Sequence, residues 1–296
     1  MQPDRIAYAL LFTLAFIWGS SFLLIVLSLQ GFEPVTVVWG RVSLAAIALI
    51  VGLLATGGKL PSGRREWLWC AFLGFIGLAV PFNLIAWSLQ TVPSGVVAVL
   101  IAAIPLFTLA LTRIIFGDHI TPARWAGFGI GLAGLALLSG PDAIAQIGAN
   151  AQAAGQIACL LASLSFAVSA ITVRAMPKIP PLSAVTGMHI CAAVMTLPVG
   201  LTHLPEVTPG LTPVIALCFL GVVQTGFAQF LRFTVIRRAG IVFASTVGYM
   251  IPVWAGILGV ILLDEPVTLS AIGAYVLIVC GLVLARPRRT EPVRPR

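Results

Sequence analysis

The sequence predicts an all-α integral membrane protein in which ten transmembrane helices form two inverted five-helix repeats. Three observations predict this fold class: a composition too apolar for a soluble domain, apolar runs of membrane-spanning length, and an internal repeat. Of the 296 residues, 59% are hydrophobic and 9% are charged, with a mean hydropathy of +1.08. A soluble domain carries about 25% charged residues, so this chain cannot cover a water-facing surface. Lipid is therefore the expected solvent around most of it.

Ten apolar runs are long enough to cross a hydrocarbon core of about 30 Å, which takes roughly 20 helical residues. The connections between them are too short to form domains. The predicted spans cover residues 6–28, 35–55, 67–89, 94–116, 122–139, 153–175, 182–204, 211–235, 240–263 and 268–285. The first run is too long for a signal peptide and lacks a small-x-small cleavage site, so we expect it to stay as a helix.

The basic residues follow an inside–outside pattern along these spans. With the N-terminus inside, the inner loops, inner helix ends and C-terminal tail hold all of the 17 lysines and arginines except Arg41, which lies within the second span. Basic loops stay in the cytoplasm, so we expect a multi-pass protein of the cell inner membrane with cytoplasmic N- and C-termini. The net charge of +8 thus reflects topology, and no nucleic-acid partner is expected.

The chain also repeats itself at a nearly constant offset. A shift of 147 residues places the Phe-Leu-Gly segment 72–74 on the identical segment 219–221. A shift of 148 residues places Arg41 opposite His189. An offset that persists over both halves is not explained by the chance alignment of apolar helices.

Each half of the chain holds five helices, so the second half must enter the membrane with the opposite polarity. We expect residues 1–148 to form the first five-helix repeat and residues 149–296 to form the second, which ends in a short basic cytoplasmic tail. Inverted repeats build alternating-access transporters that hold their substrate near the middle of the membrane, where the two halves meet. The repeat therefore predicts a transporter.

Several short motifs extend this interpretation. Residues 16–22 read FIWGSSF, residues 104–107 read IPLF and recur as IPVW at 251–254, and the ninth span closes with LLDEP at 262–266. Together with Arg41 in the second span, these motifs resemble the ten-helix EamA-type branch of the drug/metabolite transporter superfamily. The resemblance covers essentially the whole chain. In that family the ninth span closes with a similar Leu-Leu-Gly-Glu-Pro segment.

The resemblance implies a secondary transporter that exports small metabolites, because such members include bacterial inner-membrane exporters of neutral and aromatic amino acids. We therefore expect neutral or aromatic amino acids as substrates, no cofactor, no metal, and a monomer or weak homodimer in the lipid bilayer. A drug or nucleotide-sugar carrier of the same superfamily is the alternative within transport. An integral-membrane enzyme is disfavoured, because the sequence has no HExxH, no CxxC pair, no phosphate-binding loop and no catalytic Ser/His/acid set at membrane depth.

Ionisable side chains within the spans are candidate functional residues, because charge is costly in lipid. Arg41 is interpreted as an interhelical anchor, a snorkelling side chain or a coupling residue. His189 is interpreted as a hydrogen-bonded packing residue or a titratable coupling site. No Asp or Glu lies within a span, which argues against a proton-coupled exporter of lipophilic cations. Both proton-coupled and facilitated transport stay open.

The predicted substrate site combines aromatic faces with neutral hydrogen-bonding groups. Its candidate residues are Trp18, Ser21, Asn83, Trp87, Phe166, Ser169, Gln224, Gln229 and Tyr249. Small-residue helix packing is the alternative for Ser169, whereas the amides favour a cavity because they are costly to bury in lipid. A zwitterion suits this set, since its ammonium meets ring faces and its carboxylate meets amides. Arg41 and Arg232 are expected at the periphery, which disfavours a dianionic sugar nucleotide.

Two prolines, Pro105 and Pro252, fall near the middle of their spans at repeat-related positions. Each lacks an N–H group and disrupts the preceding turn, which frees the carbonyls of Ile101 and Gly248. A packing kink is one interpretation. Repeat symmetry and depth favour the other, in which both prolines are hinges beside the substrate.

Overall fold

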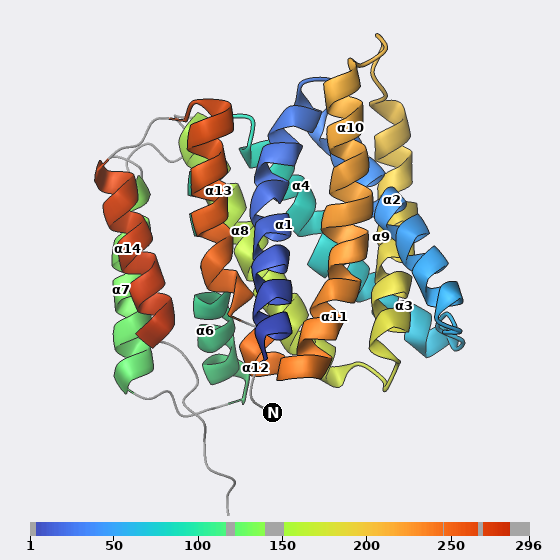
Figure 1. Cartoon of the computed structure of the whole chain (residues 1–296), viewed down its shortest axis with the longest axis horizontal. Helices are drawn as coiled ribbons and strands as arrows, with labels where there is room; N and C mark the ends of the chain where they lie inside the picture. Colours follow the sequence, from blue (N-terminus) through green and yellow to red (C-terminus); the bar gives the residue numbers. More distant parts are fainter. Residues whose placement is uncertain (1–3, 117–121, 140–150, 245, 266–268, 285–296) are drawn as a thin grey trace, which may run out of the picture.

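A computed structural model describes residues 4–116, 122–139, 151–244, 246–265 and 269–284. Within these ranges every regular element is a helix (Figure 1). The helices of the first half are α1 (Arg5–Leu29), α2 (Pro34–Ala55), α3 (Arg64–Gly74), η1 (Phe75–Ala79), α4 (Val80–Ser88), α5 (Ser94–Ile101), α6 (Ile104–Phe116) and α7 (Pro122–Ser139). Those of the second half are α8 (Ala151–Thr172), η2 (Val173–Ala175), α9 (Pro181–Thr202), α10 (Leu211–Phe219), η3 (Leu220–Phe227), α11 (Ala228–Ala239), α12 (Ile241–Ala244), α13 (Val247–Leu263) and α14 (Leu269–Leu284).

Over the described residues these helices join into ten rods, as the sequence predicts. The third rod consists of α3, η1 and α4, and the fourth of α5 and α6. In the second half, the eighth rod consists of α10, η3 and α11, and the ninth of α12 and α13. Seven segments are each long and apolar enough to cross a membrane, and a shorter apolar helix covers Met250–Leu263. The all-α membrane fold is therefore confirmed, while the repeat boundary near residue 148 lies outside the described residues.

Local sequence signals mark the helix ends. The Asp4 carboxylate caps α1 by accepting a hydrogen bond from the Ala7 N–H at 2.8 Å. Proline stands at the first position of α2, α7 and α9, where its missing N–H costs nothing. At the other end, α11 stops at Gly240, whose φ of 85° suits a residue without a side chain.

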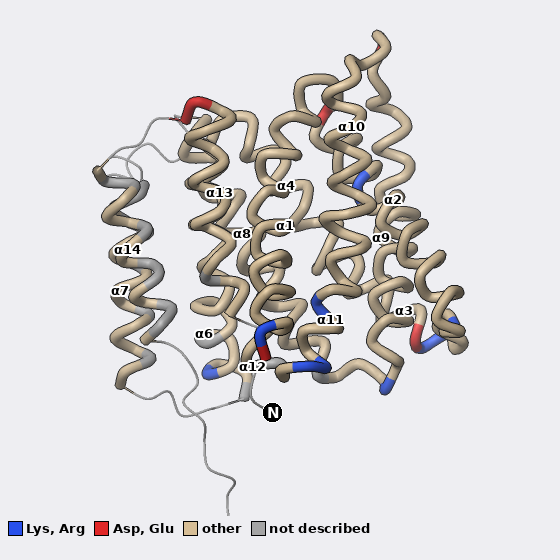
Figure 2. Tube along the Cα trace, in the orientation of Figure 1, with Lys and Arg blue, Asp and Glu red and all other residues tan. Residues whose placement is uncertain are grey.

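The two ends of the rods differ in charge, and we call them the basic edge and the acidic edge. At the basic edge, the Arg238 Nε donates to the Asp4 carboxylate at 3.1 Å. At the acidic edge, the Glu33 carboxylate lies 4.0 Å from the His203 Nε2. In Figure 2, most Lys and Arg lie along the lower edge, which is the basic edge and also carries acidic residues, whereas the charged residues drawn at the upper edge are acidic.

The first rods of the two halves run in opposite directions. Helix α1 begins at the basic edge, beside the end of α11. Helix α8 begins at the acidic edge, because the Thr91 hydroxyl, just beyond the third rod, donates to the Ala151 carbonyl at 3.2 Å. The two halves are therefore inverted with respect to each other, as the odd number of helices in each requires.

Packing between the rods follows the same repeat. Helix α1 packs on α13, and its counterpart α8 packs on α5 and α6. Two pairs of counterparts pack on each other directly, namely α2 on α9 and α7 on α14. The α7–α14 pair lies at one side of the molecule (Figure 1), where Gly281 contacts Gly127 and Gly131 so closely that no side chain fits between the helices.

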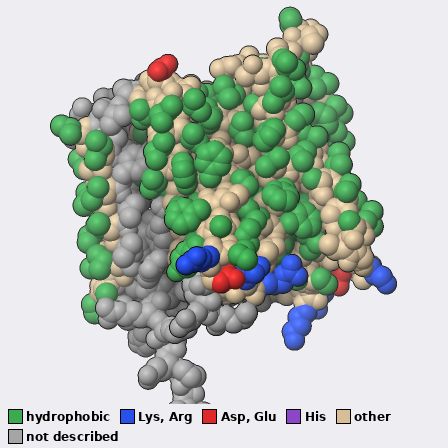
Figure 3. Space-filling view, in the orientation of Figure 1, with side chains coloured by type: hydrophobic (Ala, Val, Ile, Leu, Met, Phe, Trp, Pro, Cys, Tyr) green, Lys and Arg blue, Asp and Glu red, His purple; other side chains and the backbone are tan. Residues whose placement is uncertain are grey.

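The sides of the molecule between the two edges are apolar. Figure 3 shows hydrophobic side chains spread over this surface, with the charged groups confined to its margins. Large side chains such as Leu54, Ile114 and Val194 are more than half exposed. Exposed apolar surface on this scale is unfavourable in water and is the surface that lipid requires.

Candidate functional site

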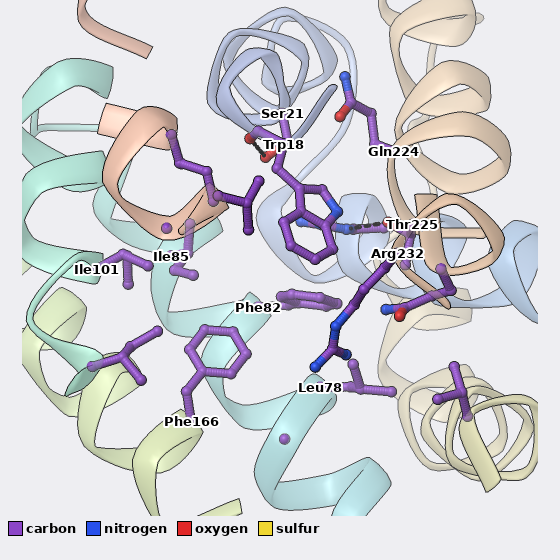
Figure 4. Close-up of a pocket in the computed structure, with 18 of the residues that line it drawn as sticks. Trp18, Ser21, Leu78, Phe82, Ile85, Ile101, Phe166, Gln224, Thr225 and Arg232 are labelled. Carbon is purple, nitrogen blue, oxygen red and sulfur yellow. Dashed lines mark hydrogen bonds between the residues drawn. The ribbon is translucent and has the colours of Figure 1, made fainter. Parts of the chain in front are cut away.

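A central cavity of about 510 Å³ lies at the junction of the two halves. This volume falls in the range of roughly 300–1,000 Å³ that is typical of small-molecule pockets. Figure 4 shows side chains from both halves converging on it. Its walls are formed by Trp18, Ser21, Phe22, Ile25, Arg41, Gly77, Leu78, Phe82, Ile85, Ile101, Ile104, Phe166, Val185, Met188, His189, Gln224, Thr225, Gln229, Arg232, Ile236, Ala244, Val247, Gly248 and Ile251.

Most of these wall residues are repeat counterparts of one another. The offset of 148 residues pairs Trp18 with Phe166 and Arg41 with His189. The offset of 147 residues gives the further wall pairs Gly77 and Gln224, Leu78 and Thr225, Phe82 and Gln229, Ile85 and Arg232, Ile101 and Gly248, and Ile104 and Ile251. The cavity therefore lies where an inverted-repeat transporter holds its substrate, between equivalent surfaces of the two halves.

Segments of π-helix shape the third and eighth rods beside the cavity. Both η1 and η3 interrupt an α-helix at repeat-related positions, and π-helical turns of this kind often mark functional sites. In η3, the Thr225 hydroxyl donates to the carbonyl of Leu220, five residues earlier, at 2.8 Å. The Gln224 amide of the same segment donates to the Ser20 hydroxyl on α1 at 2.8 Å. The π-helical segment thus turns two polar side chains toward the first half.

Arg41 is held rigidly in the wall of the cavity. Its Nε donates to the Thr225 hydroxyl at 2.9 Å, and its guanidinium carbon lies 3.8 Å from the ring centroid of Phe82. The side chain is only 8% exposed. An arginine over an aromatic face gains a cation–π interaction that strengthens when water is excluded. These contacts fix the guanidinium while leaving its two terminal NH₂ groups unengaged among the described residues.

Arg232 brings a second guanidinium to the cavity. Figure 4 shows this side chain crossing from α11 toward Phe82 and Leu78. Arg232 makes no ion pair within the described part of the chain, and no described wall residue is acidic. The cavity therefore combines two cationic groups with aromatic faces and amides. The prediction that Arg41 is peripheral is wrong, because it is buried in the wall, whereas Arg232 lines the cavity and is also exposed.

Several buried polar atoms around the cavity have no hydrogen-bond partner among the described residues. They include the Oε1 atoms of Gln224 and Gln229. His189 is 1% exposed, and its Nδ1 lies 2.8 Å from the Val185 carbonyl, which makes that nitrogen the donor. The His189 Nε2 is then an acceptor without a donor. Unsatisfied buried acceptors are costly and are typical of a site that a ligand or water completes.

The structure divides the predicted substrate residues between different places. Trp18, Ser21, Phe166, Gln224 and Gln229 line the central cavity. Ser169 is buried beside it, packed against Gly77. The side chain of Tyr249 lies outside what the structure describes.

Asn83 and Trp87 lie in a separate outer pocket near the acidic edge, together with Gln90, Glu33 and His203. Placing them in the same cavity as Gln224 is therefore a mistake. Asn83 and Trp87 do share a helix face, but helical periodicity does not identify the neighbour which that face meets. The Asn83 amide instead satisfies the Ala79 carbonyl at 2.8 Å.

The two prolines differ in their local structure. Pro105 stands directly after a break in the fourth rod, because α5 ends at Ile101 and α6 begins at Ile104. Pro252 lies inside α13, well after the start of that helix at Val247. Ile101 and Gly248, which stand four residues before these prolines, both line the cavity.

A cluster of buried apolar side chains packs between the rods toward the acidic edge. Ile25, Val38, Leu89 and Val97 belong to one buried cluster, and each lies near the acidic-edge end of its rod. The Glu265 carboxylate joins the halves at the same edge, accepting from the Ser94 N–H at 2.6 Å and from the neighbouring N–H at 3.2 Å. Sequence analysis missed this role of Glu265, although an acidic residue facing the start of α5 is a normal cap.

No three His, Cys, Asp or Glu side chains gather to hold a metal ion in the part of the chain that the structure describes. The five cysteines are all free, and they are scattered over different helices. The chemistry that the cavity offers is binding and release, through guanidinium, amide and aromatic groups.

In the described part of the chain, ten rods form two inverted halves, and the cavity at their junction has an apolar wall that carries a few polar groups. This arrangement defines a membrane transporter of the inverted-repeat class. The model of the EamA-like transporter family matches residues 5–140 and 153–286. The chain therefore belongs to the EamA-like transporter family, a group of drug/metabolite-type transporters of small molecules.

Three curated relatives and one solved structure show how far the similarity extends. The chain is similar to the "Uncharacterized inner membrane transporter YedA" of Escherichia coli strain K12, with 29% identity over 85% of this chain and 81% of that protein. It is 26% identical to the "WAT1-related protein At3g02690, chloroplastic" of Arabidopsis thaliana, over 93% of this chain and 68% of that protein. A "Probable terminal-alkyne amino-acid exporter" of Streptantibioticus cattleyicolor is 27% identical over 47% of this chain and 46% of its own length.

One crystal structure superimposes with a TM-score of 0.68, covering 95% of this chain and 98% of that chain at 20% sequence identity. This likeness supports the fold alone.

Proposed function

We propose that this transporter exports neutral or aromatic amino acids across the bacterial inner membrane by alternating access. The observation that carries the proposal is the central cavity, which combines aromatic walls, amides and guanidinium groups at the junction of the halves. An α-amino acid matches these groups, because its carboxylate suits guanidinium or amide donors and its ammonium suits ring faces. The side chain of the amino acid then lies against the apolar wall.

Two of the comparisons support this proposal. A relative that matches 47% of the chain is named as a probable amino-acid exporter, and another is named as an inner membrane transporter. The absence of an acidic residue from the described cavity wall disfavours permanent cations, because they would lack a counter-ion.

Saturable counterflow in proteoliposomes tests the substrate. Labelled phenylalanine and leucine are compared with a quaternary ammonium dye and a sugar nucleotide. We expect saturable exchange of the amino acids alone, and transport of only the dye or only the sugar nucleotide would refute the proposal. Trp18→Ala, in the central cavity, is expected to weaken exchange, whereas Trp87→Ala, in the outer pocket, serves as the matched control and is expected to retain it.

We also propose that the basic edge faces the cytoplasm, so that both termini lie inside. The gathering of Lys and Arg at this edge supports the orientation (Figure 2). A compartment-sensitive reporter fused after Arg296 or inserted at Gly63 is expected to signal only from the cytoplasm. A periplasmic signal at either position would reverse the orientation.

A further inference from the structure

The central cavity holds two guanidinium groups and no described acidic side chain to balance them. Arg41 and Arg232 both line it, and the ion pairs recorded among the described residues lie elsewhere, at the two edges. Arg41 is only 8% exposed, and leaving such a buried charge uncompensated in a largely apolar chamber is unfavourable. Arg232 is exposed, so it adds positive charge to the cavity wall without being buried. A neutral hydrogen-bonding site would need only the amides, so the two arginines call for a separate explanation.

Structural roles account for only part of Arg41. Its Nε bond to Thr225 and its stacking on Phe82 tie α2 to the eighth rod. A single N–H and one ring face satisfy this anchoring, however, and the terminal NH₂ groups remain available at the cavity wall. A guanidinium fixed in this way is pre-organised, because little side-chain entropy is lost when it binds a ligand.

Snorkelling does not account for Arg232. A snorkelling arginine on α11 extends toward the basic edge and the lipid headgroups. Figure 4 instead shows the Arg232 side chain extending toward Phe82 and Leu78. Although Arg232 is exposed, it lines the same cavity as these two residues, Trp18 and Phe166. The side chain therefore brings its charge toward the space that a substrate occupies.

We infer that the central cavity is an organic-anion site in which Arg41 and Arg232 bind a carboxylate. The planar fork of a guanidinium matches the two oxygens of a carboxylate, and such charge-assisted bonds are the strong ones. The surrounding rings and aliphatic side chains accept an apolar group attached to it. The substrate class is therefore an apolar organic acid, with the carboxylate required and the amino group dispensable.

This inference rests on the proposed function for the place of binding, but it makes a different demand on the ligand. If amides and aromatic rings were the main groups that bind a zwitterion, an amine and a carboxylic acid with the same apolar group would bind with similar affinity. If the guanidiniums dominate, only ligands that carry the carboxylate bind. Phenylalanine, 3-phenylpropionate and phenethylamine share one apolar group and separate these cases.

The test measures affinity by calorimetric titration of the purified full chain in detergent. We expect phenylalanine and 3-phenylpropionate to bind, and phenethylamine to bind at least about 10-fold more weakly. Arg232→Gln is expected to weaken 3-phenylpropionate about 10- to 100-fold, since a charged hydrogen bond is lost. Arg237→Gln, which removes an exposed charge at the basic edge, is the matched control and is expected to leave the affinity unchanged. Arg41→Gln tests the other guanidinium in the same way. If that variant does not fold, Arg41→Lys keeps the buried charge, removes the guanidinium and is measured instead.

Each outcome decides between the inference and the proposed function. Equal binding of phenethylamine, or unchanged affinity for 3-phenylpropionate in Arg232→Gln and Arg41→Lys, would overturn the anion site even if phenylalanine is transported. Arginine-dependent binding of 3-phenylpropionate without transport of any amino acid would support the anion site and refute the amino-acid proposal. Binding of none of the three ligands to the unaltered protein would overturn the inference.

Discussion

The third and eighth rods are repeat counterparts, and in both a π-helical segment interrupts the helix beside the central cavity. The wall residues at equivalent positions differ sharply between them. In the third rod they are Gly77, Leu78, Phe82 and Ile85, and in the eighth rod they are Gln224, Thr225, Gln229 and Arg232. The π-helical segment is therefore common to both rods, while the hydrogen-bonding side chains are concentrated in the eighth rod.

This difference makes the two sides of the cavity chemically unequal, although the scaffold around it is repeated. Two equivalent surfaces enclose the cavity, but a ligand between them meets an apolar wall on one side and a polar wall on the other. The first half contributes the charged group Arg41 and the hydroxyl of Ser21. Arg41 is anchored on both walls, through Phe82 and Thr225. We infer that the third rod selects for an apolar group and the eighth rod for the polar part of the substrate.

The largest expected effect on transport comes from replacing a wall residue of the eighth rod by its counterpart in the third rod. Arg232→Ile places at that position the residue that stands at its counterpart, Ile85. Transport measured as kcat/KM is expected to fall about 10- to 100-fold, because a charged hydrogen bond to the substrate is lost. Arg237→Ile is the control at the basic edge, and equal losses in both variants would show that the effect is general rather than local.

A smaller loss is expected from Thr225→Val, which keeps the shape of the side chain and removes its hydroxyl. The Arg41 Nε then loses its acceptor, at a cost of about 1–3 kcal/mol for an unsatisfied buried donor. We expect a lower free energy of unfolding in detergent together with transport reduced roughly 10-fold. Leu78→Val, at the counterpart in the third rod, controls for volume. Equal effects of the two substitutions on stability and transport would contradict the proposal that the third and eighth rods have different roles.

Pro105 and Pro252 are the predicted hinges of the two halves, and substituting each allows the halves to be compared. Pro105→Ala is expected to slow exchange several-fold by restoring a continuous fourth rod, with affinity changed less than rate. Pro252→Ala is expected to act in the same direction but less strongly, because Pro252 stands inside α13 rather than at a break. Initial rates and equilibrium binding measured on the same preparations separate the two quantities. Unchanged rates in both variants would assign the prolines to packing.

The smallest effect is expected at the basic edge, where Asp4 of the first half meets Arg238 of the second. The Ala7 N–H and, to a smaller extent, the Arg238 guanidinium hold the pKa of the Asp4 carboxyl below its ordinary value of 3.8. A lowered pKa contributes stability that is complete above the ordinary value and is lost as the pH falls below it. The unaltered protein is therefore expected to lose a little thermal stability as the pH falls below about 4. Asp4→Asn is expected to remove this pH dependence. An identical acid profile in the variant would exclude this contact as its source.

The spans and their inversion could be predicted from the sequence because both depend on local signals. Apolar runs of sufficient length identify the rods, and basic loops identify one edge. Gln224 and Gln229 could also be identified, because an amide in a span needs a polar environment wherever the span packs.

The composition of the cavity wall could not be predicted in full, for two physical reasons. Helical periodicity places Asn83 and Trp87 on one face but does not show that this face meets the outer pocket. Depth along a helix, moreover, locates a Cα atom and not the end of a long side chain, so it does not show that the Arg41 guanidinium is buried in the cavity wall. The repeat offset itself contains the missing signal, since shifting Gln229 and Arg232 by 147 residues identifies Phe82 and Ile85.

The central claim is that substrate is recognised in the central cavity by polar groups of the eighth rod. Saturable counterflow of labelled phenylalanine by Gln224→Leu/Gln229→Leu, compared with Asn83→Leu/Trp87→Leu in the outer pocket, tests this claim most directly. The account predicts that the eighth-rod variant loses saturable exchange while the outer-pocket variant retains it. Retained exchange in the eighth-rod variant, with loss in the outer-pocket variant, would contradict the account.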